Sequence, residues 1–232
     1  MAKRHITRAE LEAFLPDLFG SLSKEEANLI LSNLRIRAYK TGETIYREGD
    51  NPKCLHCLLE GKIKITRQGV GKREQILRLI SSVDYFGLSA ALARENYSST
   101  STVLVDSTVA LIPLEIFLPL LESNASLASI VAQRVSKTLQ LCYRRTVNLT
   151  QKHIRGRLAE GILYMKDVFG VNNEGFIDCQ LSREELAYLC NMTGSNSIRT
   201  LSLLARENIL QVIGRSIRIL NEPKLTLISE QG

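Results

Sequence analysis

The stretch LSREELAYLCNMTGSNSIR, residues 181–199, predicts two short helices separated by a tight break. Ser182 and Glu185 have the spacing of a capping box, which places the start of the first helix at Arg183. Thr193 can cap the second helix. We expect the apolar residues of that second helix to face inward, namely Ile198, Leu201, Leu204 and Ala205. The stretch therefore predicts a compact helix-turn-helix pair.

The outer face of the second helix carries residue types that can read DNA bases. Ser195, Asn196 and Arg199 fall on its N-terminal outer side, where a recognition helix presents its base-reading residues. Arginine is the natural bidentate partner of guanine, and asparagine is that of adenine. We therefore expect these three residues to read bases, the alternative being a helical hairpin that only packs.

Residues that could hold a DNA backbone surround this helix pair. A β-hairpin is expected from Ile209 to Leu220, with its turn at Gly214 and Arg215, and it would form a wing. No acidic residue occurs between Glu122 and Glu160, whereas basic residues recur there, which fits a polyanionic partner and a solvated helix face about equally. The expected backbone contacts are Arg155, Arg157, Ser182, Thr193, Ser197, Gly214 and Arg215.

The segment from Arg35 to Pro113 has strand spacing instead of helical spacing. Short β-type runs alternate there with glycine-containing turns. The expected strands are Ile36–Tyr39, Glu43–Tyr46, Leu55–Leu59, Lys62–Thr66, Gln75–Ile80, Thr102–Val105 and Val109–Ile112. Many short strands with such punctuation favour an antiparallel jelly-roll barrel.

One long helix is expected to follow the barrel. Residues 126–150 contain neither glycine nor proline, and a helix of that length would span roughly 38 Å. Only part of such a helix can lie against a barrel, so a second copy of the helix is its simplest partner. The stripe expected to face that partner consists of Leu127, Val131, Arg134, Thr138 and Leu141.

These patterns together predict an α+β chain in three parts. Residues 1–123 would form an N-terminal antiparallel jelly-roll β-barrel with a helical lead-in, which acts as a sensor domain. Residues 124–150 would form the long dimerisation helix, and residues 151–232 a C-terminal winged helix-turn-helix domain.

Composition narrows the class of protein. The 232 residues are 44% hydrophobic and 23% charged, as in soluble globular proteins, and the formal net charge is +6. No run approaches the roughly 18 apolar residues of a membrane-spanning helix, and Met1–His5 lead into a charged segment, not a signal sequence. Five scattered cysteines do not make a disulfide framework. We expect a cytoplasmic protein with reduced thiols and no membrane partner.

The chain resembles the Crp/Fnr transcription regulators nearly from end to end. In the barrel the resemblance rests on residues 40–50, 58–65, 84–87 and 105–113, and in the C-terminal part on Leu181–Ala187, Arg199, Leu201, Leu204 and Asn208–Leu210. It implies a cyclic-nucleotide-binding-like barrel, a long dimer helix and a winged helix-turn-helix. It also implies contact with RNA polymerase.

The chain departs from the members of this family that bind cyclic AMP. Those members carry a glutamate directly after the Phe-Gly and an arginine before the next strand, where this chain has Leu88 and Tyr97. One hydroxyl, that of Ser98, cannot replace a guanidinium against a buried phosphate. We therefore do not expect cyclic AMP, and a smaller or more apolar effector and no effector both stay open. Candidate pocket residues are Gly87, Leu88, Tyr97, Ser98, Arg134 and Thr138.

Other site chemistries have little support in the sequence. Cys54 and Cys57 stand three apart on an expected strand and would point to opposite faces, so we interpret them as buried structural cysteines and not as metal ligands. His56 alone is weak evidence for haem, and His5 and His153 form no facial triad with a carboxylate. We expect no metal, no cofactor and no enzymatic activity.

The function that these features predict is sequence-specific regulation of transcription. A homodimer would bind a near-palindromic operator in double-stranded DNA, under the control of a small-molecule effector other than cyclic AMP or of none. The alternative is a dimeric ligand-binding sensor whose winged helix contacts protein instead of DNA.

Overall fold

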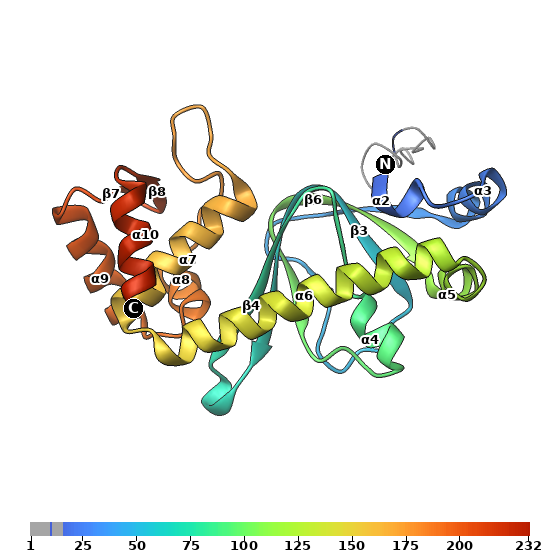
Figure 1. Cartoon of the computed structure of the whole chain (residues 1–232), viewed down its shortest axis with the longest axis horizontal. Coiled ribbons are helices and arrows are strands. Elements are labelled where there is room, and N and C mark those ends of the chain that lie inside the picture. Colours follow the sequence, from blue (N-terminus) through green and yellow to red (C-terminus); the bar gives the residue numbers. More distant parts are fainter. Residues whose placement is uncertain (1–9, 11–15) are drawn as a thin grey trace. The chain divides into compact units, whose positions relative to one another are not determined.

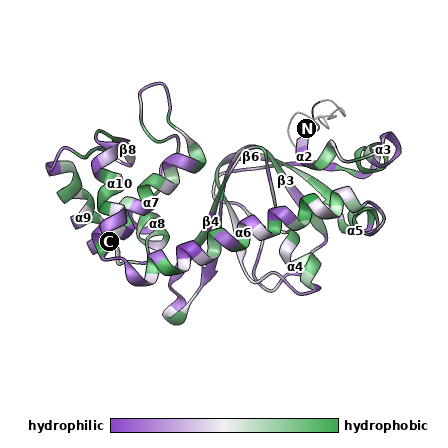
Figure 2. Ribbon diagram, in the orientation of Figure 1, coloured by the Kyte–Doolittle hydropathy of each residue, from purple (hydrophilic) through white to green (hydrophobic). Residues whose placement is uncertain are grey.

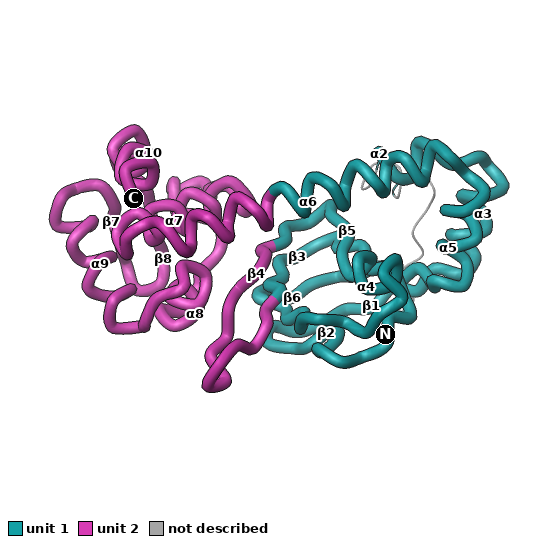
Figure 3. The backbone as a smooth tube through the Cα atoms, turned by 60° about the horizontal axis from the view of Figure 1, so that its bottom comes forward, with its two compact units in different colours: residues 1–65, 80–140 teal, residues 66–79, 141–232 magenta. Residues whose placement is uncertain are grey.

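A computed structural model of the chain describes residue 10 and residues 16–232 (Figure 1). The other N-terminal residues, His5 included, lie outside the described part. Contacts divide the chain into two compact units, residues 1–65 with 80–140 and residues 66–79 with 141–232, which Figure 3 shows in different colours.

The first unit is built on an antiparallel sheet, as the strand spacing predicts. The strands of this sheet are β1 (Arg35–Tyr39), β2 (Thr44–Tyr46), β3 (Cys54–Gln68), β4 (Glu74–Ser81), β5 (Asp84–Phe86) and β6 (Thr100–Pro113). The end of β3 and most of β4 fall within residues 66–79 and are therefore counted with the second unit (Figure 3). The sheet has the order β1-β6-β3-β4, and β2 and β5 pair with β6 and β3 respectively. β1 and β2 pair antiparallel with β6, and β5 pairs antiparallel with β3.

Two of these strands are longer than expected. The runs Leu55–Leu59 and Lys62–Thr66 form one strand, β3, and the last two expected runs form one strand, β6. Each long strand passes through its expected break without leaving the sheet. The prediction also missed β5 and the short helix α4 (Leu88–Ala93), because three-residue strands and six-residue helices carry too little periodicity to detect.

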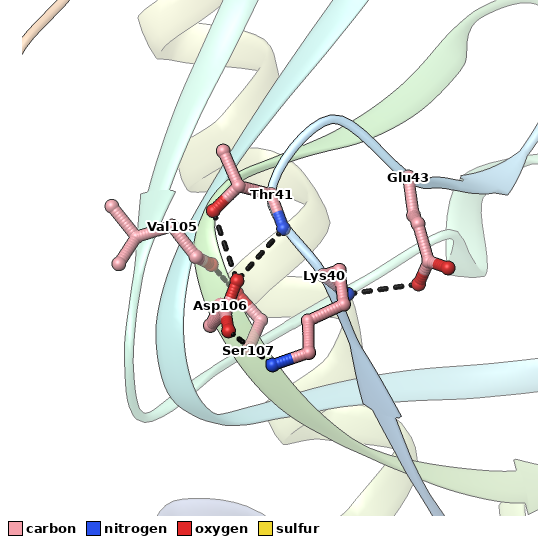
Figure 4. Close-up of polar contacts among 6 residues, drawn as sticks. All are labelled: Lys40, Thr41, Glu43, Val105, Asp106 and Ser107. Carbon is pink, nitrogen blue, oxygen red and sulfur yellow. Dashed lines mark hydrogen bonds and ion pairs between the residues drawn. The ribbon is translucent and has the colours of Figure 1, made fainter.

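A polar corner holds the middle of β6 against the loop between β1 and β2 (Figure 4). Lys40 donates to Asp106 over 2.7 Å, and the backbone N–H and hydroxyl of Thr41 donate to the same carboxylate over 2.9 and 3.0 Å. The hydrogen bond from Lys40 has the largest effect, followed by those from Thr41, and together they lower the pKa of Asp106 to about 2. The carboxylate therefore stays charged at any physiological pH.

Helices close the first unit around its apolar core. They are α2 (Pro16–Phe19), α3 (Lys24–Asn33) and α5 (Leu114–Ser123), together with the start of α6 (Ala125–Gln151). One core cluster joins Phe19 and Ile30 to Phe117, and Leu127 of α6 belongs to it. Figure 2 shows hydrophobic and hydrophilic residues interleaved along α6, as expected for a helix with one buried face.

The second unit contains the expected helix pair and hairpin. It holds α7 (Ile154–Phe169), α8 (Arg183–Leu189), α9 (Gly194–Arg206), β7 (Leu210–Ile213), β8 (Ser216–Ile219) and α10 (Glu222–Gln231). The turn between β3 and β4, with the 3-10 helix η1 (Val70–Lys72), belongs to the same unit. Within the described residues no single helix is long and apolar enough to span a membrane. Only α5 and α6 taken together have that length and apolarity, and the pair is bent by 109° at its junction.

Gly61 of β3 lies directly against the polar corner. Its φ is +106°, and a Cβ added there would stand 2.0 Å from Ser107 Oγ and 2.7 Å from Ser107 Cα. Ser107 cannot give way freely, because its hydroxyl donates to Val105 O over 2.5 Å and accepts from Lys62 N over 3.2 Å. A side chain at position 61 would therefore meet both backbone strain and a clash.

We predict that Gly61→Ala lowers the free energy of unfolding by about 3 kcal/mol or more, because left-handed strain of about 1–2 kcal/mol adds to overpacking of similar size. Gly42→Ala is the matched control, since Gly42 has φ +86° with no atom within 4 Å of an added Cβ and should cost only the strain. Urea denaturation of both variants measures the difference, and equal losses would contradict the clash.

Candidate functional site

The helix pair is held by the caps that its sequence predicts. Ser182 Oγ accepts from Glu185 N over 3.1 Å, and the Glu185 carboxylate accepts from Ser182 N over 2.8 Å, which confirms the capping box. Thr193 Oγ1 accepts from Asn196 N over 3.2 Å and caps α9. The starts of both helices are therefore fixed within the sequence LSREELAYLCNMTGSNSIR.

The inner face of α9 differs from the expected one, because Ser197 and Thr200 are buried, Ile198 is exposed and Ala205 is only half-buried. Leu201 and Leu204 are buried as predicted, but Ile198 is 51% exposed, so the prediction that it faces inward is wrong. Ser197 is 0% exposed and cannot reach a DNA phosphate, so its expected backbone contact is wrong as well. The small side chains of Ser197 and Thr200 belong to the buried stripe near the start of α9. With the helix rotated so that these two residues face the core, Ile198 faces outward.

The base-reading candidates lie on the other side of α9. Ser195 and Arg199 are exposed, and Asn196 is half-buried beside them. Arg199 Nη2 donates to Asn196 Oδ1 over 3.2 Å, so the asparagine amide positions the guanidinium one turn along the helix. The two residues therefore act as one unit, in which Arg199 extends from the surface.

The wing forms as expected and brings two arginines together. β7 and β8 pair antiparallel with Ile213 opposite Ser216, and Gly214 and Arg215 make the turn. Arg183, at the start of α8, donates to the carbonyl of Gly214. Burial, and then the nearby charge of Arg215, lower the pKa of Arg183. An anion at this position would relieve the repulsion between the two cations.

Arg183 is the residue that the sequence interpretation of the site missed. It stands inside the motif next to the capping Ser182, but nothing in linear spacing indicates that it reaches the tip of a hairpin 31 residues later. Its contact with Gly214 also links the helix pair to the wing. Only the folded chain reveals this contact.

The two arginines expected at the DNA backbone near the start of α7 already have protein partners. Arg155 makes two hydrogen bonds to the carboxylate of Glu207, over 2.8 and 2.5 Å. Arg157 donates to Asn191 O over 2.6 Å and to Leu149 O over 3.3 Å. Both residues thus hold the domain together, and their contact with DNA stays a prediction.

An aromatic cluster fills the barrel interior around Gly87. The rings of Tyr46 and Tyr97 stack with centroids 3.8 Å apart and planes 13° apart, and His56 stacks on Phe86 at 5.2 Å. A Cβ at Gly87 would stand 3.0 Å from His56 Nδ1 and 3.3 Å from the Tyr97 oxygen. The space beside Gly87 is therefore occupied by side chains of the protein itself.

The side chains around Gly87 offer hydrogen-bonding groups but are uncharged. His56 Nδ1, Tyr97 Oη and Ser101 Oγ are buried, and none of them has a hydrogen-bond partner within the described part of the chain. Burial lowers the pKa of His56 to about 4, so the ring is neutral at pH 7. Burial, followed by the effect of Tyr46, raises the pKa of Tyr97. An uncharged environment of this kind disfavours a phosphate.

The structure gathers only part of the expected effector pocket. Gly87 and Tyr97 meet in the barrel interior, whereas Leu88 is buried in the other core cluster and Ser98 is exposed. Arg134 forms an ion pair with Asp84 and lies 5.5 Å from the ring centroid of Tyr85. Thr138 Oγ1 donates to the carbonyl of Arg134 and so stays on its own helix.

The expected dimer stripe is wrong in its first half. Leu127 and Val131 are 0% and 2% exposed in the single chain, because they pack into the core of the first unit. A spacing of four and three residues marks any buried stripe of a helix, whether its partner is the same chain or another. The apolar residues of α6 that are exposed form a different face: Val135, Leu139, Tyr143 and Val147.

The cysteines show no metal-binding arrangement. Cys57 is buried, Cys54 is half-buried, and burial raises the pKa of both thiols. Across residue 10 and residues 16–232 no group of three or more histidine, cysteine, aspartate or glutamate side chains could hold a metal ion.

We predict that Tyr97→Phe leaves the free energy of unfolding unchanged or raises it by up to about 1 kcal/mol, because the hydroxyl that it removes is buried and unpaired. Tyr164→Phe is the matched control. The Tyr164 hydroxyl accepts from Leu79 N over 3.1 Å, so its loss should cost about 1 kcal/mol. Urea denaturation measures both, and an equal cost for Tyr97→Phe would contradict the unpaired hydroxyl.

Comparison with known proteins gives the same two-part organisation. Residues 36–124 match the cyclic nucleotide-binding domain family, and residues 156–228 match the Crp-like helix-turn-helix domain family. The chain is 25% identical over 196 residues to a cyclic AMP receptor protein of Thermus thermophilus, with 84% of this chain and 88% of that protein covered. A cyclic AMP-activated regulator of Pasteurella multocida is 22% identical over 190 residues, covering 81% of this chain and 90% of that protein.

Solved structures share the fold over most of the chain. A Crp/Fnr-family regulator from Eubacterium rectale superposes with a TM-score of 0.78 at 19% identity, covering 94% of this chain and all of that one. FixK2 from Bradyrhizobium japonicum superposes with a TM-score of 0.76 at 20% identity, covering 84% and 96% of the two chains. With both domain families matched in order, this chain belongs to the Crp/Fnr family of transcription regulators and carries a helix-turn-helix DNA-binding domain.

Proposed function

We propose that the protein binds a near-palindromic DNA site as a homodimer, with α9 of each subunit in the major groove. The observation that carries this proposal is the outer face of α9, where Arg199 extends from the surface with Asn196 bonded to it. An arginine so held can donate two parallel hydrogen bonds to O6 and N7 of guanine. Arg183 and Arg215 at the wing would bind the phosphates beside it.

The exposed face of α6 supports the second subunit. Ala132, Val135, Leu139, Cys142 and Thr146 alternate at spacings of three and four, the pattern of a two-stranded coiled-coil seam. All five are exposed in the single chain, and Tyr143 and Val147 flank them. In a parallel dimer each residue of this seam would lie close to the same residue of the other subunit.

The aromatic filling of the barrel supports an effector other than cyclic AMP, or none. A cyclic phosphate needs a cation, and the buried groups around Gly87 are Tyr46, His56, Phe86 and Tyr97, of which none is charged at pH 7. We propose no haem, metal or other cofactor, and no catalytic role. Contact with RNA polymerase and a cytoplasmic location follow from the proposed regulation of transcription.

Selection of binding sites from randomised duplex DNA tests this function. We expect the wild-type protein to recover a two-fold symmetric site containing a guanine in each half. Arg199→Ala should weaken binding by on the order of 1–3 kcal/mol per half-site and relax preference at that guanine alone. Recovery of no site under any effector condition would favour a winged helix that contacts protein.

The matched control is Arg215→Ala, at the tip of the wing. Loss of a phosphate contact should weaken binding to all sequences alike and lower the salt slope by about one unit per subunit. A relaxed base preference in Arg215→Ala, or a uniform loss in Arg199→Ala, would contradict the assigned roles.

Cross-linking at Cys142 tests the dimer face. Among the five cysteines, all within the described residues, Cys142 alone is exposed. We predict that a short bismaleimide links two native chains in high yield through Cys142, because twin residues of a seam lie within the reach of the reagent. Cys142→Ser should abolish the product and Leu139→Asp should reduce it, whereas a wild-type monomer in sedimentation would contradict this face.

A further inference from the structure

Ile198 is an exposed apolar side chain at the edge of the polar face of α9. It is 51% exposed, and Ser195, Arg199 and Ser202 stand three residues before it, one after it and four after it. Residues three and four apart share one side of a helix, so Ile198 lies on the same side as Ser195 and Ser202 and next to Arg199. The rest of its unit therefore covers about half of the Ile198 surface.

Packing within the chain gives no reason for an isoleucine at this position. The buried stripe of α9 consists of Ser197, Thr200, Leu201 and Leu204, and Ile198 does not belong to it. A β-branched residue is also a weaker helix former than alanine at an exposed position. Single exposed apolar residues are common on protein surfaces, so exposure alone decides nothing.

The position of Ile198 is what distinguishes it from an ordinary exposed residue. Leu203 on the same helix is 43% exposed, but it lies five residues later, about 7.5 Å farther along the axis and beyond the N-terminal residues by which a recognition helix contacts bases. Ile198 instead directly precedes Arg199, the proposed guanine reader, on the face that would enter the groove. The major groove contains one apolar group on its base edges, the 5-methyl group of thymine.

We propose that Ile198 contacts the methyl group of a thymine adjacent to the guanine bound by Arg199, and that it thereby selects a T·A pair at that position. The inference rests on the proposed function, because it assumes that this face of α9 enters the major groove. Burial of one methyl group against Ile198 should raise affinity about fourfold per half-site. Arg199 then selects the guanine by hydrogen bonds and Ile198 its neighbour by apolar contact.

The test removes the methyl group from the DNA and the side chain from the protein separately. Each thymine of a selected site is replaced in turn by deoxyuridine, which keeps the base pair and lacks only the methyl group. For the wild-type protein we expect one position in each half-site, next to the guanine, where the substitution raises Kd about fourfold. Every other thymine should be neutral at this level.

The variants assign that methyl effect to one residue. Ile198→Ala, an exposed substitution by the best helix former, should bind the thymine and deoxyuridine sites equally. Leu203→Ala is the matched control and should keep the fourfold difference. The inference is overturned if no thymine beside the guanine is sensitive, or if Ile198→Ala keeps the difference. Failure of the wild type to select any site would instead overturn the proposed function, so the two failures are distinguishable.

Discussion

The burial of Leu201 and Leu204 fixes the rotation of α9 about its axis, and the functional surface depends on that rotation. With these two side chains in the core of the domain, Arg199 and Ile198 must face outward. The Thr193 cap fixes where the helix begins, so the outward residues fall within its first two turns. A change of phase by one residue would move the guanidinium of Arg199 by about 100° round the helix.

The second unit joins the DNA-binding helices to the turn of the barrel sheet. Arg145 of α6 donates to Ile76 O of β4 and to Leu189 O of α8, both over 3.2 Å, and lies 4.6 Å from the ring centroid of Tyr164. Gln75 adds a 2.6 Å bond to Tyr188 O. The guanidinium of Arg145 therefore contacts β4, α7 and α8 at the same time. Because Arg145 bonds to both β4 and α8, a displacement of β4 would change the contacts at the C-terminal end of α8.

The sequence predicted the features that depend on local chemistry. The capping box of Ser182, the uninterrupted helix after residue 125 and the hairpin at Gly214 all form as expected, because each is determined by a few neighbouring residues. Helix α10 was missed although Asn221 caps it and Pro223 stands in its first turn, since one short helix carries a weak apolar pattern.

Features that depend on distant packing could not be predicted. Leu127 and Val131 were assigned to the dimer face of the long helix, but the fold shows that they pack into the core of their own chain. Ile198 was assigned inward because apolar residues usually are, while the small Ser197 occupies that place. The contact of Arg183 with Gly214 and the stacking of Tyr97 on Tyr46 join segments that no local pattern relates.

The central claim is that two copies of α9 read guanines in successive major grooves of one site. Methylation interference with dimethyl sulfate measures this directly, because the reagent methylates guanine N7 in the major groove and adenine N3 in the minor groove. We predict strong interference at guanine N7 at two positions separated by about one helical turn, 10–10.5 base pairs. Interference confined to adenine N3, or found in only one half of the site, would contradict the account.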